Sequence, residues 1–150
     1  MSWQPGRLRS GEVIAGTGAI ALAACLFALP WYARSSTTVD GWNALTIARW
    51  LMVVTILVVL ALVILQARME APALPVTLSM FGTVLGGLTS LVLIDRVLIS
   101  TPFADTRAGA YLGLASSLVL TYGAGRSLRS EGPDPASNAP IPTVRLPSSS

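Results

Sequence analysis

The sequence has no histidine, no lysine and a single cysteine, and only 11% of its 150 residues are charged. Without histidine it lacks the commonest general base and the commonest metal ligand in proteins. The lone Cys25 excludes an intrachain disulfide, the cysteine pair of a thiol oxidoreductase and haem attachment through CxxCH. We therefore predict no catalytic residue, no metal and no cofactor, and we expect that the chain is not an enzyme.

Other binding signatures are also missing. The glycine-rich stretch at 11–18 has neither a Gly-Lys-Ser/Thr ending nor a preceding strand, so it is not a phosphate loop. The net charge is +3, but the arginines are scattered along the chain instead of forming a basic patch, and we expect no nucleic-acid partner.

Long apolar runs dominate what is present. The chain is 53% hydrophobic, and four runs are each long enough for the roughly 20 residues that a helix needs to cross a bilayer. We predict an all-α fold, an integral membrane four-helix bundle whose principal partner is the lipid bilayer. The predicted spans are about 13–33, 44–66, 74–99 and 108–125.

Arginine placement predicts the orientation, because positive residues near span ends favour the cytoplasmic side. More arginines lie on the side that holds both chain ends than on the other side. We predict a cytoplasmic segment at 1–12, a transmembrane domain at 13–129 and a disordered, proline-rich cytoplasmic tail at 130–150. The arginines placed inside are Arg7, Arg9, Arg68, Arg126, Arg129 and Arg145.

Aromatic residues gather near the predicted outer ends of the spans. Tryptophan and tyrosine favour the membrane interface, where the ring is buried and its polar tip reaches the headgroups. The predicted interface anchors are Trp31, Tyr32, Trp42, Trp50 and Tyr111.

Small residues recur at intervals that favour close helix packing in lipid. The third span holds a GxxxG pair, Gly82 and Gly86, and the fourth span has a small residue at every fourth position. The spacing suits packing within the chain or packing against another subunit. The stripe in the fourth span consists of Gly109, Gly113, Ser117, Thr121 and Gly125.

Arg49 and Asp95 are the two charges that stand deepest in the predicted spans, at similar depth toward the outer side. A charge inside a membrane helix is costly and is often functional. We predict either an intramembrane ion pair between them or side chains that extend to the interface. Glu12 is expected to be an exposed charge at the inner mouth of the first span.

Three short patterns carry a family resemblance. Gly41-Trp42 enters the second span, Arg107 to Leu112 reads Arg-Ala-Gly-Ala-Tyr-Leu, and 126–129 reads Arg-Ser-Leu-Arg. With arginine in place of lysine and abundant alanine, glycine and proline, residues 10–130 resemble the small four-helix membrane proteins frequent in high-GC actinobacteria. The resemblance implies a multi-pass protein of a bacterial plasma membrane and implies no activity.

We expect a non-enzymatic accessory or scaffold subunit that packs against other membrane proteins or against itself. The alternative is a small transporter or channel that forms its pathway by oligomerisation. A polar stripe centred on Arg49 and Asp95 and facing water would favour transport, whereas a dry, packed interior would favour the accessory role.

Overall fold

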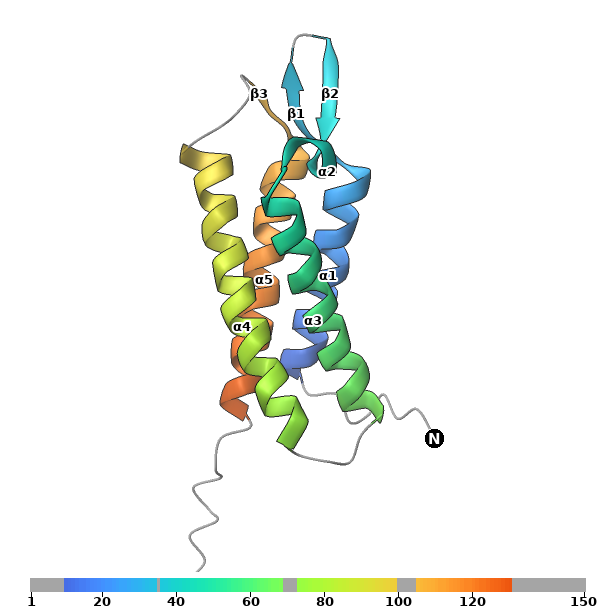
Figure 1. The fold of residues 1–150 in the computed structure, drawn as a ribbon, viewed down its shortest axis with the longest axis vertical. Coiled ribbons are helices and arrows are strands. Elements are labelled where there is room, and N and C mark those ends of the chain that lie inside the picture. The colour runs from blue at the N-terminus through green and yellow to red at the C-terminus, as the bar shows by residue number, and fades with distance from the viewer. Residues whose placement is uncertain (1–9, 35, 69–72, 100–104, 131–150) are drawn as a thin grey trace, which may run out of the picture.

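The computed structural model describes residues 10–34, 36–68, 73–99 and 105–130, and the predictions made for 1–9 and 131–150 lie outside these ranges. Most of the described residues are helical, and three short strands lie among the helices (Figure 1). In chain order the elements are α1 (Ser10–Ala28), β1 (Pro30–Arg34), β2 (Thr37–Asp40), α2 (Gly41–Ala44), α3 (Ala48–Arg68), α4 (Ala73–Ile94), the π-helical segment η2 (Asp95–Ile99), β3 (Asp105–Thr106) and α5 (Ala108–Ser130).

Three helical stretches are long and apolar enough to cross a membrane. At about 1.5 Å per residue, each has a length near the roughly 30 Å of a bilayer's hydrocarbon core. The stretches are Ser10–Ala28, Ala48–Ala67 and Ser79–Ile99. By length and composition, these three are the candidate spans among the residues described.

The structure is mostly helical, as predicted, but the first predicted span, 13–33, does not remain helical to its end. Helix α1 ends at Ala28, and β1 pairs antiparallel with β2 on one side and β3 on the other, giving the order β2-β1-β3. Pro30 cannot continue a helical hydrogen-bond ladder, and Trp31 and Tyr32 favour strands. Hydropathy alone cannot separate such a strand from the end of a span.

Other predicted span boundaries also differ from the helix boundaries in the structure. The predicted start of the second span at 44 coincides with the end of α2, and α3 begins at Ala48. Asp40 caps α2, since its carboxylate accepts a hydrogen bond from the backbone N–H of Asn43 at 3.2 Å. Helix α5 continues beyond the predicted end at 125, as far as Ser130.

The four long helices lie side by side (Figure 1). Helix α1 contacts α3 and α5, and α4 contacts the same two helices from the other side. The small sheet and α2 lie at one end, and the start of α1 and the end of α5 lie together at the opposite end. The contact between α1 and α5 is the most extensive in the molecule.

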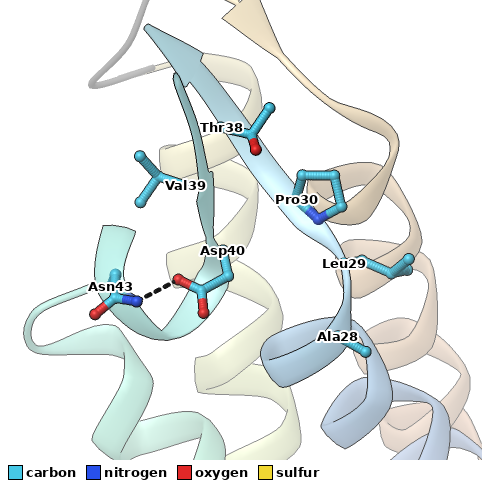
Figure 2. Close-up of a pocket in the computed structure, with 7 residues that line it drawn as sticks. All are labelled: Ala28, Leu29, Pro30, Thr38, Val39, Asp40 and Asn43. Carbon is cyan, nitrogen blue, oxygen red and sulfur yellow. Dashed lines mark hydrogen bonds between the residues drawn. The ribbon is translucent and has the colours of Figure 1, made fainter. Parts of the chain in front are cut away.

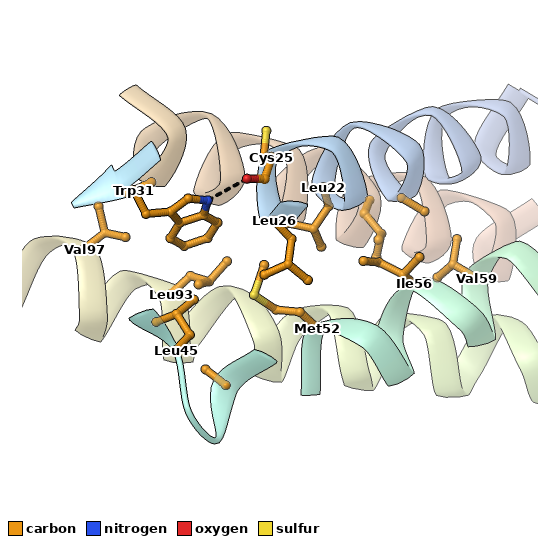
Figure 3. Packing of buried hydrophobic residues seen from close by; sticks show 14 of the residues in the cluster. Leu22, Cys25, Leu26, Trp31, Leu45, Met52, Ile56, Val59, Leu93 and Val97 are labelled. Carbon is orange, nitrogen blue, oxygen red and sulfur yellow. Dashed lines mark hydrogen bonds between the residues drawn. The ribbon is translucent and has the colours of Figure 1, made fainter. Parts of the chain in front are cut away.

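Large apolar side chains fill the space between the helices. Leu26, Met52 and Leu93 are completely buried there, and so is the side chain of Trp31, which extends from β1 (Figure 3). The outward faces of the same helices are apolar as well: Ile20 is 63% exposed and Leu91 is 66% exposed. Helices that are apolar on both packed and outward faces are typical of a membrane environment.

Candidate functional site

The predicted stripe on α5 divides between two neighbours. At its start the stripe faces β1: a Cβ added to Gly109 would lie 2.5 Å from the carbonyl oxygen of Pro30. A Cβ added to Gly113 would lie 2.5 Å from the ring of Trp31. A side chain at either position would collide with β1, so these two glycines allow the small sheet to pack against α5.

The second half of the stripe faces α4. The hydroxyl of Ser90 lies 3.2 Å from the hydroxyls of both Ser117 and Thr121. A Cβ on Gly125 would make only an ordinary contact, 3.8 Å from the methyl of Thr83. A spacing of four residues drifts by about 40° per step around a helix of 3.6 residues per turn, which explains why one stripe meets two partners.

The GxxxG pair of α4 packs within the chain. A Cβ on Gly86 would lie 2.7 Å from the Thr121 hydroxyl oxygen, whereas one on Gly82 would lie 3.4 Å from a methyl of Val59. The adjacent Gly87 has no atom within 4 Å of its Cβ position. Gly86 is therefore the tight contact of the pair.

The closest helix contact, between α1 and α5, uses three glycines outside the predicted packing set. A Cβ on Gly18 would lie 2.6 Å from the backbone nitrogen of Leu120. One on Gly11 would lie 2.7 Å from the backbone nitrogen of Ser127, and one on Gly123 would overlap the backbone of Ala15. The two backbones touch along most of their length.

A signal for this contact exists in the sequence. Alternating steps of four and three residues keep side chains on one face of a left-handed helix pair, whereas constant steps of four do not. The alternating positions are Gly11, Ala15, Gly18 and Leu22 on α1, and Gly109, Gly113, Ser116, Leu120, Gly123 and Ser127 on α5.

Glu12 lies at the same end of α1. It was expected to be an exposed charge, but it is only 2% exposed.

The five predicted interface anchors have different environments. Trp31 and Tyr32 are completely buried by protein, so their rings belong to the core and do not face lipid. Trp42 is half-buried, whereas Trp50 is 57% exposed and Tyr111 is 51% exposed. Trp50 and Tyr111 remain the anchors best placed to reach an interface.

Trp31 closes the end of α1. Its indole N–H donates a hydrogen bond of 2.7 Å to the carbonyl of Cys25, one of the last four carbonyls of that helix, which lack helical partners (Figure 3). A Cβ on Gly41 would lie 2.7 Å from the same ring. The indole thus links α1, α2 and α5 at one point.

Arg49 packs against aromatic rings. Its guanidinium carbon lies 5.0 Å from the centre of the Trp42 ring and 5.7 Å from that of Trp50, and Nη1 donates to the Trp42 carbonyl at 3.3 Å. The predicted pair with Asp95 is not among the contacts of Arg49 with described residues. Because α3 begins at Ala48, Arg49 stands in its first turn instead of five residues inside a span.

We expect substitutions at Arg49 and Asp95 to be additive in their effect on stability. In a double-mutant cycle with Arg49→Leu and Asp95→Leu, the coupling energy should be below about 0.5 kcal/mol. The cycle of Arg49→Leu with Trp42→Leu should give about 1 kcal/mol, the energy of a partly desolvated cation–π contact. Unfolding free energies in mixed micelles give both coupling energies. An Arg49–Asp95 coupling energy above that of the Arg49–Trp42 cycle would contradict this expectation and support the ion pair.

Tyr32 joins the sheet to η2, the π-helical segment that follows α4. Its hydroxyl donates to the carbonyl of Arg96 at 3.1 Å. Burial raises the pKa of the Tyr32 phenol above its ordinary value of 10.0, and the nearby positive charge of Arg96 opposes part of that rise. The neutral phenol is therefore the form that the fold stabilises.

This raised pKa predicts a loss of stability in alkaline solution. The unfolded chain releases the Tyr32 proton near its ordinary pKa of 10.0, before the folded chain does, so the stabilisation is complete below that pH and falls as the pH rises. In a titration of tyrosinate absorbance, Tyr32 should ionise late, above its ordinary pKa of 10.0. Tyr32→Phe should remove the late step, and Tyr111→Phe and Tyr122→Phe should keep it; removal by either of these would contradict the assignment.

Hydroxyl groups provide the polar contacts between the described helices. Thr55 lies 2.8 Å from Thr89 across α3 and α4, and Ser90 links α4 to α5. Hydroxyls also bond to carbonyls of their own helices, with Thr55 donating to the carbonyl of Leu51 at 2.8 Å. These hydroxyl pairs join α3 to α4 and α4 to α5.

Pockets lie near both ends of the helical bundle. One pocket of about 560 Å³ lies beside the sheet (Figure 2), where the carboxylate of Asp40 is already bonded to Asn43 at 2.6 Å. Within the described ranges, no three His, Cys, Asp or Glu residues group together as metal ligands would. The pocket is lined by Ala28, Leu29, Pro30, Thr38, Val39, Asp40 and Asn43.

In comparisons with protein-family models, curated proteins and solved structures, this chain has no match.

Proposed function

We propose that the chain is a multi-pass membrane protein built as a transmembrane four-helix bundle. Three described stretches have the length and composition of spans. Helix α5 packs on α1 from the contact of Gly11 with Ser127 at one end, and Gly109 meets Pro30 just beyond α1 at the other. A helix held along the whole length of a span lies at the same depth, and so we place α5 as the fourth span.

We infer that both chain ends are cytoplasmic and that the membrane is a bacterial plasma membrane. The start of α1 and the end of α5 lie at the same end of the bundle (Figure 1), where Arg126 and Arg129 are exposed. Positive residues favour the cytoplasmic side. The bacterial assignment rests on the resemblance of residues 10–130 to small actinobacterial membrane proteins.

For its role, we infer a non-enzymatic accessory or scaffold subunit. The observation that carries this inference is the packed interior, in which buried hydroxyls bond to one another or to helix carbonyls. A transporter would need a polar pathway, and the Arg49 guanidinium is instead stacked on two indoles. The partners would be lipid, other membrane proteins or a second copy of the chain.

Two measurements test these proposals in turn. Alkaline extraction of membranes should leave the protein in the pellet, and its appearance in the supernatant would contradict the membrane placement. A photo-crosslinking residue at exposed Leu91 should then give discrete products with another polypeptide, whereas the same residue at buried Leu93, two positions away, should give none. Lipid adducts alone from Leu91, and likewise from Leu57 on α3 and Ile20 on α1, would overturn the subunit role.

A further inference from the structure

A second hollow, of about 350 Å³, lies along the last three turns of α5. A volume of this size suits a small ligand or a headgroup. The described residues that line it follow one another at alternating steps of one and three, the pattern i, i+1, i+4, i+5 and i+8, and thus share one face of the helix. They are Thr121, Tyr122, Gly125, Arg126 and Arg129.

The absence of a side chain at Gly125 creates the space in this hollow. Among the described residues, the nearest atom to a Cβ there is the methyl of Thr83 at 3.8 Å, an ordinary contact, so a larger side chain would extend into this space. Because Thr83 belongs to α4, the hollow opens on the side of α5 that faces α4. Tyr122, which is 62% exposed, flanks it with a ring and a hydroxyl group.

The charged side chains that line the hollow are both positive. Arg126 and Arg129 are exposed, so their guanidinium groups are accessible to a ligand. Residues three apart on a helix are neighbours, so the two guanidinium groups can act on one ligand. Guanidinium groups bind phosphate oxygens in bidentate fashion, and a tyrosine and a threonine hydroxyl beside them add donors.

We propose that this hollow binds the phosphate headgroup of an anionic phospholipid. The proposal rests on the membrane placement proposed above, which puts the end of α5 at the cytoplasmic interface. Basic pockets between membrane helices on that side suit anionic headgroups. The acyl chains would then lie against the apolar outer surface of α4, where Val84 is 59% exposed. A soluble phosphate compound has no chains to use that surface.

The test is a titration of the full chain in detergent, with bound lipid counted by native mass spectrometry. The probes are phosphatidylglycerol, phosphatidylcholine of the same chain length, and inorganic phosphate. Wild type should prefer phosphatidylglycerol. The double variant Arg126→Gln with Arg129→Gln should bind it about thirtyfold more weakly, at about 1 kcal/mol for each arginine. Arg107→Gln, at the opposite end of α5, is the matched control and should bind like wild type.

Gly125→Leu separates a pocket from a charged surface, because it fills the hollow and leaves both arginines in place. It should weaken binding about tenfold or more, and Gly125→Ala, which the space admits easily, should have a smaller effect in the same direction. Unchanged binding in the double arginine variant or in Gly125→Leu would overturn the site. Equal affinity for inorganic phosphate would overturn its assignment to lipid. If the protein resists alkaline extraction yet shows no lipid preference, the site fails and the membrane placement stands; extraction of wild type would overturn the membrane placement.

Discussion

Gly123→Ala should destabilise the protein by about 3 kcal/mol, at the upper end of the cost of overpacking a tight core. The new methyl would overlap the backbone nitrogen of Ala15 and lie 2.8 Å from the carbonyl oxygen of Gly11. Neither atom is the flexible end of a side chain, so relief requires α1 and α5 to separate. Unfolding in mixed micelles, followed by helical circular dichroism, would measure the loss.

Gly87→Ala is the matched control, one helix away and also within an apolar run. No atom lies within 4 Å of its Cβ position. The substitution should be neutral or stabilising by up to about 1 kcal/mol, because alanine favours the helix more than glycine does. If Gly123→Ala proved as mild as Gly87→Ala, the close contact between α1 and α5 would be wrong.

In the membrane that we propose for this chain, the predicted effect follows from how helices associate in lipid. Lipid tails are as apolar as leucine, so the helices gain little from burying apolar surface and depend on close van der Waals contact. Gly18 allows the backbone of Leu120 to approach α1 in the same way, and Gly18→Ala should fail similarly. The alternating spacing of these glycines makes the α1–α5 pair the tightest packed element of the fold.

The helices were predictable because composition alone reveals long apolar runs. The ends of those runs were not, because residues 30–33 continue the apolar run whether they form a strand or extend a helix. That difference moved Trp31 and Tyr32 from a predicted interface into the core. Residues 45–47 separate α2 from α3, so Arg49 lies in the first turn of α3, beside Trp42.

Packing partners were less predictable than packing residues. Small residues at fixed spacing indicate that some helix approaches closely, but the sequence does not say which one. Gly113 meets Trp31, a residue more than 80 positions away, and only the fold of the sheet brings them together. The hollow at Gly125 could not be predicted for a related reason. The position of Gly125 fits the packing stripe on α5, but in the structure this glycine lines a hollow.

Trp31→Ala should cost about 4 kcal/mol, the usual range for deleting a fully buried tryptophan. The indole is completely buried, and it fills the space left by the missing side chains of Gly41 and Gly113. Its loss would open a cavity where the sheet, α2 and α5 meet. Trp31→Phe should cost less, about 2 kcal/mol, since a ring remains but the carbonyl of Cys25 loses its donor.

Trp50→Ala distinguishes a core tryptophan from an interfacial one. Trp50 is 57% exposed and contacts Arg49, so its removal should cost only about 1 kcal/mol of unfolding free energy. Its larger effect should be on the depth of the protein in the bilayer, measured by quenching of the remaining tryptophans with lipids labelled at defined depths. If instead Trp50→Ala cost more stability than Trp31→Ala, the assignment of Trp31 to the core and of Trp50 to the interface would be wrong.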